Sequence, residues 1–238
     1  MNNLVDLHTH SVLSKHAYSS ITENIDAAIE TKLKYLGLSE HQSDPQGVGA
    51  HIYAFANLSI VPREYKGLKI LRGIEFNILN DKPIDKTNLK LKDLDYGIAS
   101  IHAFCYSDAG YIGNTENVLR ALEDKEVLIL GHLDRGFYEM DYEKIISRCK
   151  QLHKLIEIND ASLFKLSEEN YKKAVAIMNK MLAICEKYKQ PIIMNSDAHI
   201  KYHVGKIDSA IKVVEEAEFP PELILNYNEN LLLEYFKV

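Results

Sequence analysis

Short apolar runs alternate with amphipathic segments along the whole chain. Seven runs rich in Val, Ile and Leu have the length and composition of buried strands. Between them, apolar residues recur every three or four positions, which predicts helices with one buried face. The predicted strands are 5–10, 35–39, 68–78, 95–104, 127–133, 155–159 and 191–196. The predicted helices are 21–33, 50–60, 115–124, 142–154, 169–188, 206–218 and 228–237.

Alternating strands and helices predict a parallel sheet with helices on the outside. The chain has no glycine-rich dinucleotide fingerprint, so we favour an α/β barrel over an open sheet, one unit short of the eight-fold form. Two stretches, 42–67 and 81–94, are irregular, and loops of such length in compact domains are often functional. No shift in composition marks a boundary, so we predict one domain over residues 1–238.

The composition, 46% hydrophobic and 26% charged, is ordinary for a globular protein. No apolar run approaches the roughly 18 residues of a membrane-spanning helix, and no membrane partner is predicted. Cys105, Cys149 and Cys185 are widely spaced, which excludes a Cys-x-x-Cys zinc site and fits a cytoplasmic location. We expect no signal peptide, because the first strand begins at residue 5.

The net charge of −6 makes a nucleic-acid partner unexpected. An acidic protein can still bind an anionic substrate where metal ions reverse the local charge. The sequence leaves the oligomeric state open.

His8 and His10 end the first predicted strand. Residues two apart on a strand point to the same face, so this pair could hold one divalent metal ion. Two polar residues at the end of a strand explain the pair equally well, and on this stretch alone that interpretation is preferred.

Later strands change that balance, because they too end in histidines and acids. The carboxyl ends of parallel barrel strands meet at one mouth, whereas unrelated histidines would be scattered through helices and loops. Glu75 lies inside an apolar strand, where a carboxylate is costly unless it is paired or bound to metal. With His16 added from the loop after the first strand, the set is His8, His10, His16, His41, Glu75, His102, His132, Asp197 and His199.

Imidazole and carboxylate together suit zinc, iron or manganese. Nine potential ligands exceed the needs of one ion, so the sequence predicts a multinuclear site.

The candidate ligands lie in six short motifs: Asp6-Leu7-His8-Thr9-His10-Ser11, Glu40-His41, Arg72-Gly73-Ile74-Glu75, Ile101-His102, Gly131-His132 and Asn195-Ser196-Asp197-Ala198-His199. These motifs in this order resemble the PHP (polymerase and histidinol phosphatase) family, over residues 5 to about 235. Lys15-His16-Ala17-Tyr18-Ser19 and Phe219-Pro220-Pro221-Glu222 are similar to its short stand-alone phosphatases of the YcdX type.

The resemblance implies a distorted (β/α)7 TIM-like barrel with three divalent metal ions, zinc in first place and manganese or iron as alternatives. It implies one ion on His8, His10, Glu75 and Asp197. A second ion would bind Glu75, His102 and His132, with Glu75 bridging. A third would bind His16, His41 and His199.

Three features depart from the family pattern. Glu40 stands where many members have Asp, and Leu133 follows His132 where Pro is common. Residues 42–67 match poorly, so no substrate contact is transferred there, and the roles of His51 and His203 stay open.

The expected activity is hydrolysis of a small phosphomonoester by metal-activated water. Glu75 would bridge two ions, Asp197 could accept the proton of the water, and Arg135, three residues after His132, could contact the phosphate. Asn159 could orient the substrate or cap the following turn. Arg72 is excluded, because strand alternation turns it away from the face of Glu75. A histidinol-phosphate phosphatase proper and a non-catalytic metal-binding PHP domain are the alternatives.

Overall fold

Seven parallel strands form a nearly closed barrel in a computed structural model that describes residues 2–44, 47–82 and 84–236. The order around the barrel is β1-β2-β4-β5-β6-β7-β8. The bounds are β1 Val5–Asp6, β2 Tyr35–Leu38, β4 Leu68–Asn77, β5 Tyr96–Ser100, β6 Val127–Leu130, β7 Leu155–Asn159 and β8 Ile192–Asn195. The predicted α/β barrel is therefore confirmed.

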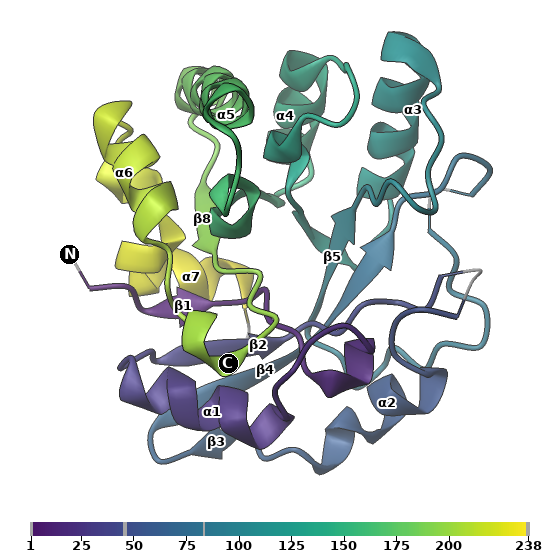
Figure 1. Ribbon diagram of the computed structural model, residues 1–238, viewed down its shortest axis with the longest axis vertical. Coiled ribbons are helices and arrows are strands. Elements are labelled where there is room, and N and C mark those ends of the chain that lie inside the picture. Colours follow the sequence, from purple (N-terminus) through teal and green to yellow (C-terminus); the bar gives the residue numbers. More distant parts are fainter. Residues whose placement is uncertain (1, 45–46, 83, 237–238) are drawn as a thin grey trace.

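Helices surround this sheet (Figure 1), with α3, α4 and α5 packed side by side outside the later strands. The helices are α1 Ile21–Glu30, α2 Ile52–Asn57, α3 Gly110–Leu122, α4 Tyr142–Gln151, α5 Glu168–Tyr188, α6 Asp208–Glu216 and α7 Glu229–Tyr235. In the described part of the chain, no helix is long and apolar enough to cross a membrane.

The inside of the barrel is filled by a small apolar cluster that includes Leu7, Leu71 and Ile129. From below, Leu232 of α7 and Phe236 join this cluster, and the Phe236 ring meets Tyr96 edge-on at 5.7 Å. Helix α7 and Phe236 therefore cover the amino-terminal end of the barrel, opposite the carboxyl ends of the strands.

One side chain joins the first and last strands of the barrel. Asn226 is fully buried, accepts from Met194 N at 2.7 Å, and donates to the carbonyls of Met194 at 2.8 Å and Val5 at 3.1 Å. Further up, the pairing is completed by a bridge between Thr9 and Ala198.

Some predicted boundaries differ from the structure. Strands β1, β5 and β6 end earlier than predicted, so that His8, His102 and His132 follow these strands instead of lying inside them. Helix α3 begins at Gly110 rather than Thr115: two glycines lower its helix propensity, and tertiary contacts of Asn114 override it.

The irregular stretches also differ in detail. Residues 42–67 contain α2 and the short strand β3 (Glu64–Tyr65), which pairs antiparallel with β4 and was not predicted. Pro45, Gln46 and Pro83 in these stretches, and Lys237 at the end of the last predicted helix, lie outside the described residues.

We expect Asn226→Ala to lower the free energy of unfolding by about 2–4 kcal/mol, because it leaves a buried N–H and two carbonyls without their partner. Asn228→Ala is the matched control. It removes the cap on Leu231 N and a long, exposed hydrogen bond to the Glu222 carbonyl, and should cost about 1 kcal/mol. Urea titration of both variants checks this, and equal losses would contradict the closing role of Asn226.

Candidate metal centre

Most candidate ligands lie just beyond the carboxyl ends of the strands, where backbone pairing continues past the strands; Glu75 lies inside β4, and His16 comes from the loop after β1. His41 forms a parallel bridge with Glu75, and the backbone N–H of Gln42 donates to the Glu75 carbonyl at 2.8 Å. The N–H of His10 likewise donates to the Ala198 carbonyl at 2.8 Å. These bonds fix the register of ligands that come from opposite ends of the chain.

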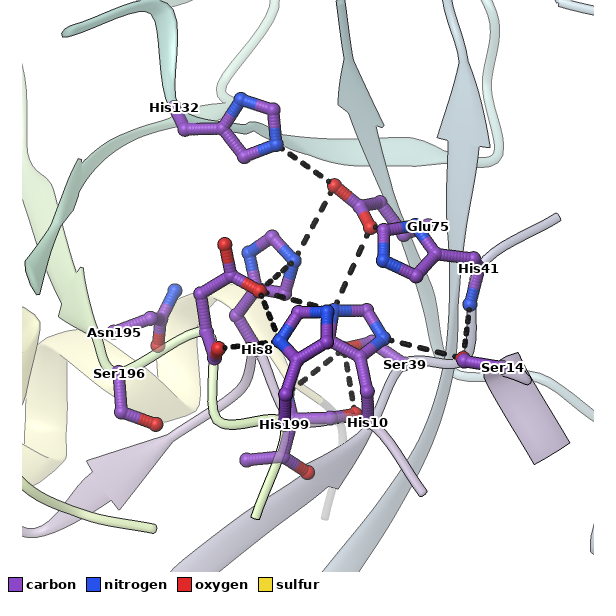
Figure 2. A network of polar contacts seen from close by, with 12 residues as sticks. His8, His10, Ser14, Ser39, His41, Glu75, His132, Asn195, Ser196 and His199 are labelled. Carbon is purple, nitrogen blue, oxygen red and sulfur yellow. Dashed lines mark hydrogen bonds and ion pairs between the residues drawn. The ribbon is translucent and has the colours of Figure 1, made fainter. Parts of the chain in front are cut away.

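Glu75 is fully buried at the centre of the cluster, and Figure 2 shows imidazoles facing its carboxylate. Three imidazoles approach Oε1 and two approach Oε2. The Oε1 contacts are His8 Nε2 at 3.3 Å, His102 Nε2 at 3.2 Å and His132 Nε2 at 3.1 Å. The Oε2 contacts are His10 Nε2 at 3.6 Å and His41 Nδ1 at 2.6 Å. One carboxylate thus links five of the predicted ligands.

Asp197 forms a second focus of the same cluster. Its Oδ1 lies 3.1 Å from His10 Nε2 and 3.6 Å from His8 Nε2, while its Oδ2 accepts from Arg135 at 2.6 Å. Both Asp197 and His132 have positive φ, 51° and 26°, a strained backbone for residues with side chains. Such strain is frequent at functional sites, where the surrounding structure holds it in place.

The remaining predicted ligands close the cluster on its outer side. The ring centroid of His16 lies 4.7 Å from that of His41 and 4.8 Å from that of His199. The structure therefore brings all nine predicted ligands together. Three overlapping triads have potential ligand atoms within 4.8 Å of one another: His10–His41–His199, His8–His10–Glu75 and His41–Glu75–His102.

Hydrogen bonds at Nδ1 orient several of these rings, so that Nε2 faces inward. His8 Nδ1 lies 2.8 Å from Glu157 Oε1, and His102 Nδ1 lies 2.7 Å from Asn77 Oδ1. The Nδ1 atoms of His16 and His199 face backbone carbonyls at 2.8 and 2.9 Å. Metal-binding histidines are typically fixed in this way through the nitrogen that does not bind the metal.

Buried polar atoms inside the cluster lack hydrogen-bond partners among the described residues. They are Nε2 of His8, His10, His41 and His102, Nδ1 of His41, Oε2 of Glu75 and Oδ1 of Asp197. His41 Nδ1 and Glu75 Oε2 approach each other at 2.6 Å, but without the geometry of a hydrogen bond. Buried polar groups normally have partners. A set of imidazole nitrogens and carboxylate oxygens left open toward one point fits divalent metal ions.

The electrostatics of His10, His132 and Glu75 suit the same purpose. Burial, and then the neighbouring His41, hold the pKa of His10 well below its usual range, and burial with Arg135 lowers the pKa of His132 to about 4. Burial would raise the pKa of Glu75, but the nearby imidazoles outweigh it and hold that pKa well below its usual range. Neutral imidazoles and ionised carboxylates are the forms that bind metal.

Glu157 is an important residue that was not predicted. It lies on β7, fully buried, and holds His8 at its Oε1. Its Oε2 accepts from the backbone N–H of His132 at 2.8 Å, so one carboxylate supports ligands from two strands. Asn159 and Asn195 complete its four partners at 3.0 and 2.8 Å. A carboxylate within an apolar strand, the signal that drew attention to Glu75, was available here too.

The other candidates separate into those at the mouth and those away from it. Arg135 is at the mouth, 26% exposed at its side chain. Asn159 also reaches the cluster, donating to Asp197 Oδ2 at 3.3 Å, and it caps the turn that follows β7. Arg72 points outward and donates to the carbonyls of residues 59 and 61, as predicted.

Three exposed side chains make other contacts. Lys15 donates to the Gly47 carbonyl, His51 caps α2, and His203 meets the Phe164 ring edge-on at 5.2 Å.

The fold and the site together define the class of this protein: an α/β barrel with a cluster of potential ligands for divalent metal ions at its mouth. The chain belongs to the PHP domain family, whose model matches residues 6–195. A relative named "Probable phosphatase" from Clostridium acetobutylicum is 36% identical over 239 residues, covering 100% of this chain and 96% of the relative. A second of that name from Thermoanaerobacter pseudethanolicus is 35% identical over 245 residues, with the same coverage of both chains.

Among solved structures, the chain is similar to histidinol phosphate phosphatase from Lactococcus lactis, determined with zinc, L-histidinol and phosphate. The TM-score is 0.63 at 19% identity, over 92% of this chain and 95% of that one. This likeness confirms the fold. The "Probable phosphatase" relatives confirm the predicted enzyme class, a phosphoric monoester hydrolase, and the ligand cluster supports its dependence on metal.

Proposed function

We propose that this protein hydrolyses a small phosphomonoester with water activated at a centre of three divalent metal ions, zinc in first place. The observation that carries the proposal is the set of buried, inward-facing imidazole and carboxylate atoms without hydrogen-bond partners among the described residues. Manganese and iron suit the same donors and are the alternatives.

The proposed ligand sets are those that the family resemblance implies. The contacts of Glu75 and Asp197 with His8 and His10 support the first set, and the approach of His102 and His132 to Glu75 Oε1 supports the second. Ring contacts among His16, His41 and His199 support the third. His41 also lies against Glu75, so the second and third sets would share a boundary there.

Bound divalent ions would supply a hydroxide at neutral pH and neutralise the charge of the phosphoryl group. In this proposal Glu75 keeps two ligand sets at a fixed separation. Asp197 would accept the proton of the attacking water, because its carboxylate stays ionised: although burial raises the pKa, His8, His10 and Arg135 hold it well below its usual range.

Arg135 is proposed to bind the phosphate. Its guanidinium carries five N–H groups and uses one nitrogen on Asp197, which orients it toward the centre and leaves donors for phosphate oxygens. We place the protein in the cytoplasm, on the cysteine usage described above.

Purified protein is expected to contain about three metal ions per chain and to hydrolyse phenyl phosphate in a chelator-sensitive manner. His10→Ala should lower turnover at least about 100-fold. It removes a metal ligand itself, and loss of a residue that merely supports a ligand already costs about 10- to 100-fold. Elemental analysis and a phosphate-release assay check both points. His153→Ala, at the far end of the barrel on the chain between α4 and β7, is the control.

Bound metal without hydrolysis of any phosphomonoester would contradict the proposal. It would favour a diester substrate or a non-catalytic metal-binding domain.

A further inference from the structure

A pocket of about 460 Å³ opens beside the candidate metal centre, between the turn after β6, the turn after β7 and α5. Arg135 belongs to its wall and at the same time donates to Asp197 Oδ2 at 2.6 Å. The pocket therefore begins where the phosphate would bind. A volume of this size is typical of sites for small molecules.

The turn that carries Arg135 passes the side chain of Ile177 at Gly136. This residue has φ 60°, and a Cβ at this position would lie 2.1 Å from Ile177 Cδ1, the end of a side chain of α5. The left-handed φ favours glycine here. Arg135 and the half-exposed ring of Phe137 lie on either side of this glycine in the chain, and both line the pocket.

The charge of this pocket is opposite to that of the whole chain. Arg135 and Lys173 supply two cations, Ser162 and Asn170 are neutral, and no acidic side chain is among the described residues that line it. Within the described ranges, Lys173 also has no carboxylate within the 4.0 Å of an ion pair. The chain carries a net charge of −6.

Neighbouring pockets contain acidic side chains. The one beside His41 includes Asp44 and Asp85, and the one beside His203 combines Asp160 and Asp208 with Lys206. A third, on the other side of Phe137, shares Lys173 and includes Glu139 and Lys180.

We propose that this pocket, which we call the Arg135 pocket, receives the leaving group of the substrate and selects one that carries a second anionic group. The inference rests on the proposed function. Arg135 would meet the phosphate that is cleaved, and Lys173 would pair with a carboxylate or second phosphate further along the substrate. Phe137 and Leu166 would contact the apolar body between the two anions.

Three matched aryl phosphates test this: phenyl phosphate, 4-carboxyphenyl phosphate and 4-(aminomethyl)phenyl phosphate. Their leaving groups differ in intrinsic reactivity, so the readout is the ratio of kcat/KM for the carboxylate to that for phenyl phosphate, compared between variants. In Lys173→Met this ratio should fall about fivefold, the effect of one solvent-exposed ion pair. In Lys173→Glu the preference should reverse, so that the ratio of kcat/KM to that for phenyl phosphate rises for the aminomethyl compound and falls for the carboxylate.

Lys172→Met is the matched control. Lys172 is the preceding residue on α5, pairs with Glu168 at 2.6 Å, and does not line the pocket. The ratio of kcat/KM values in Lys172→Met should therefore equal that of the wild type. A ratio unchanged in both Lys173 variants would overturn the pocket proposal while leaving the phosphatase intact. No hydrolysis of any of the three compounds by metal-loaded wild type would instead overturn the proposed function.

Discussion

Replacing Glu75 by Gln is expected to remove about two of the three metal ions and to lower kcat/KM by at least about 10³-fold. The substitution keeps the shape of the side chain but removes the charge on which five imidazoles converge. In the proposed ligand sets Glu75 is the only shared residue, so its loss affects two ions at once. Elemental analysis and the phenyl phosphate assay measure the two effects.

Glu64→Gln is the control for Glu75→Gln. This substitution makes the same chemical change at an exposed position on strand β3, which pairs with β4. It should retain wild-type metal content and activity. Full metal content in Glu75→Gln would show that Glu75 is not a bridging ligand, and full activity would remove it from catalysis.

Glu157→Gln is expected to weaken metal binding or activity by about 10- to 100-fold, although Glu157 is not among the proposed ligands. Its two oxygens accept from four donors, and a glutamine offers one oxygen, so its amide group would face two N–H groups in either orientation. Burial lowers the pKa of His8, but Glu157 and two further carboxylates outweigh it and raise that pKa. Losing the charge of Glu157 makes His8 a poorer ligand.

A metal titration of the folded apoprotein separates this role from a general loss of stability. The dissociation constant for metal should increase in Glu157→Gln under conditions where circular dichroism shows a native fold. The Asn226→Ala variant serves as the comparison, because it disturbs the same barrel without touching a ligand. A lower melting temperature with unchanged metal affinity would assign Glu157 a purely structural role.

The ligand cluster could be predicted because each ligand carries its own signal. Histidines and acids at the ends of apolar runs are visible in the sequence, and parallel strands bring those ends together. Alternation along β4 correctly separated Glu75, which faces the interior, from Arg72, which faces α2 and its following turn.

The supporting residues were harder to predict because their partners are distant in the sequence. Glu157 meets residues 149 and 25 positions away, and Asn226 reaches a strand 221 positions earlier. A single asparagine next to Leu223-Ile224-Leu225, outside every predicted strand and helix, gives no sign of such a role. The Arg135 pocket was missed for a related reason: its lining comes from two turns and a helix that are separated in the sequence.

The closure of the barrel by Asn226 has a consequence for how the nascent chain matures. Until β8 and residue 226 emerge from the ribosome, β1 has β2 as its only strand neighbour, and its other edge is unprotected. Open strand edges invite association, and long-range parallel pairing is slow. His8 and Asp197 meet only once β8 has paired with β1, so loading with metal is expected to follow the synthesis of both segments.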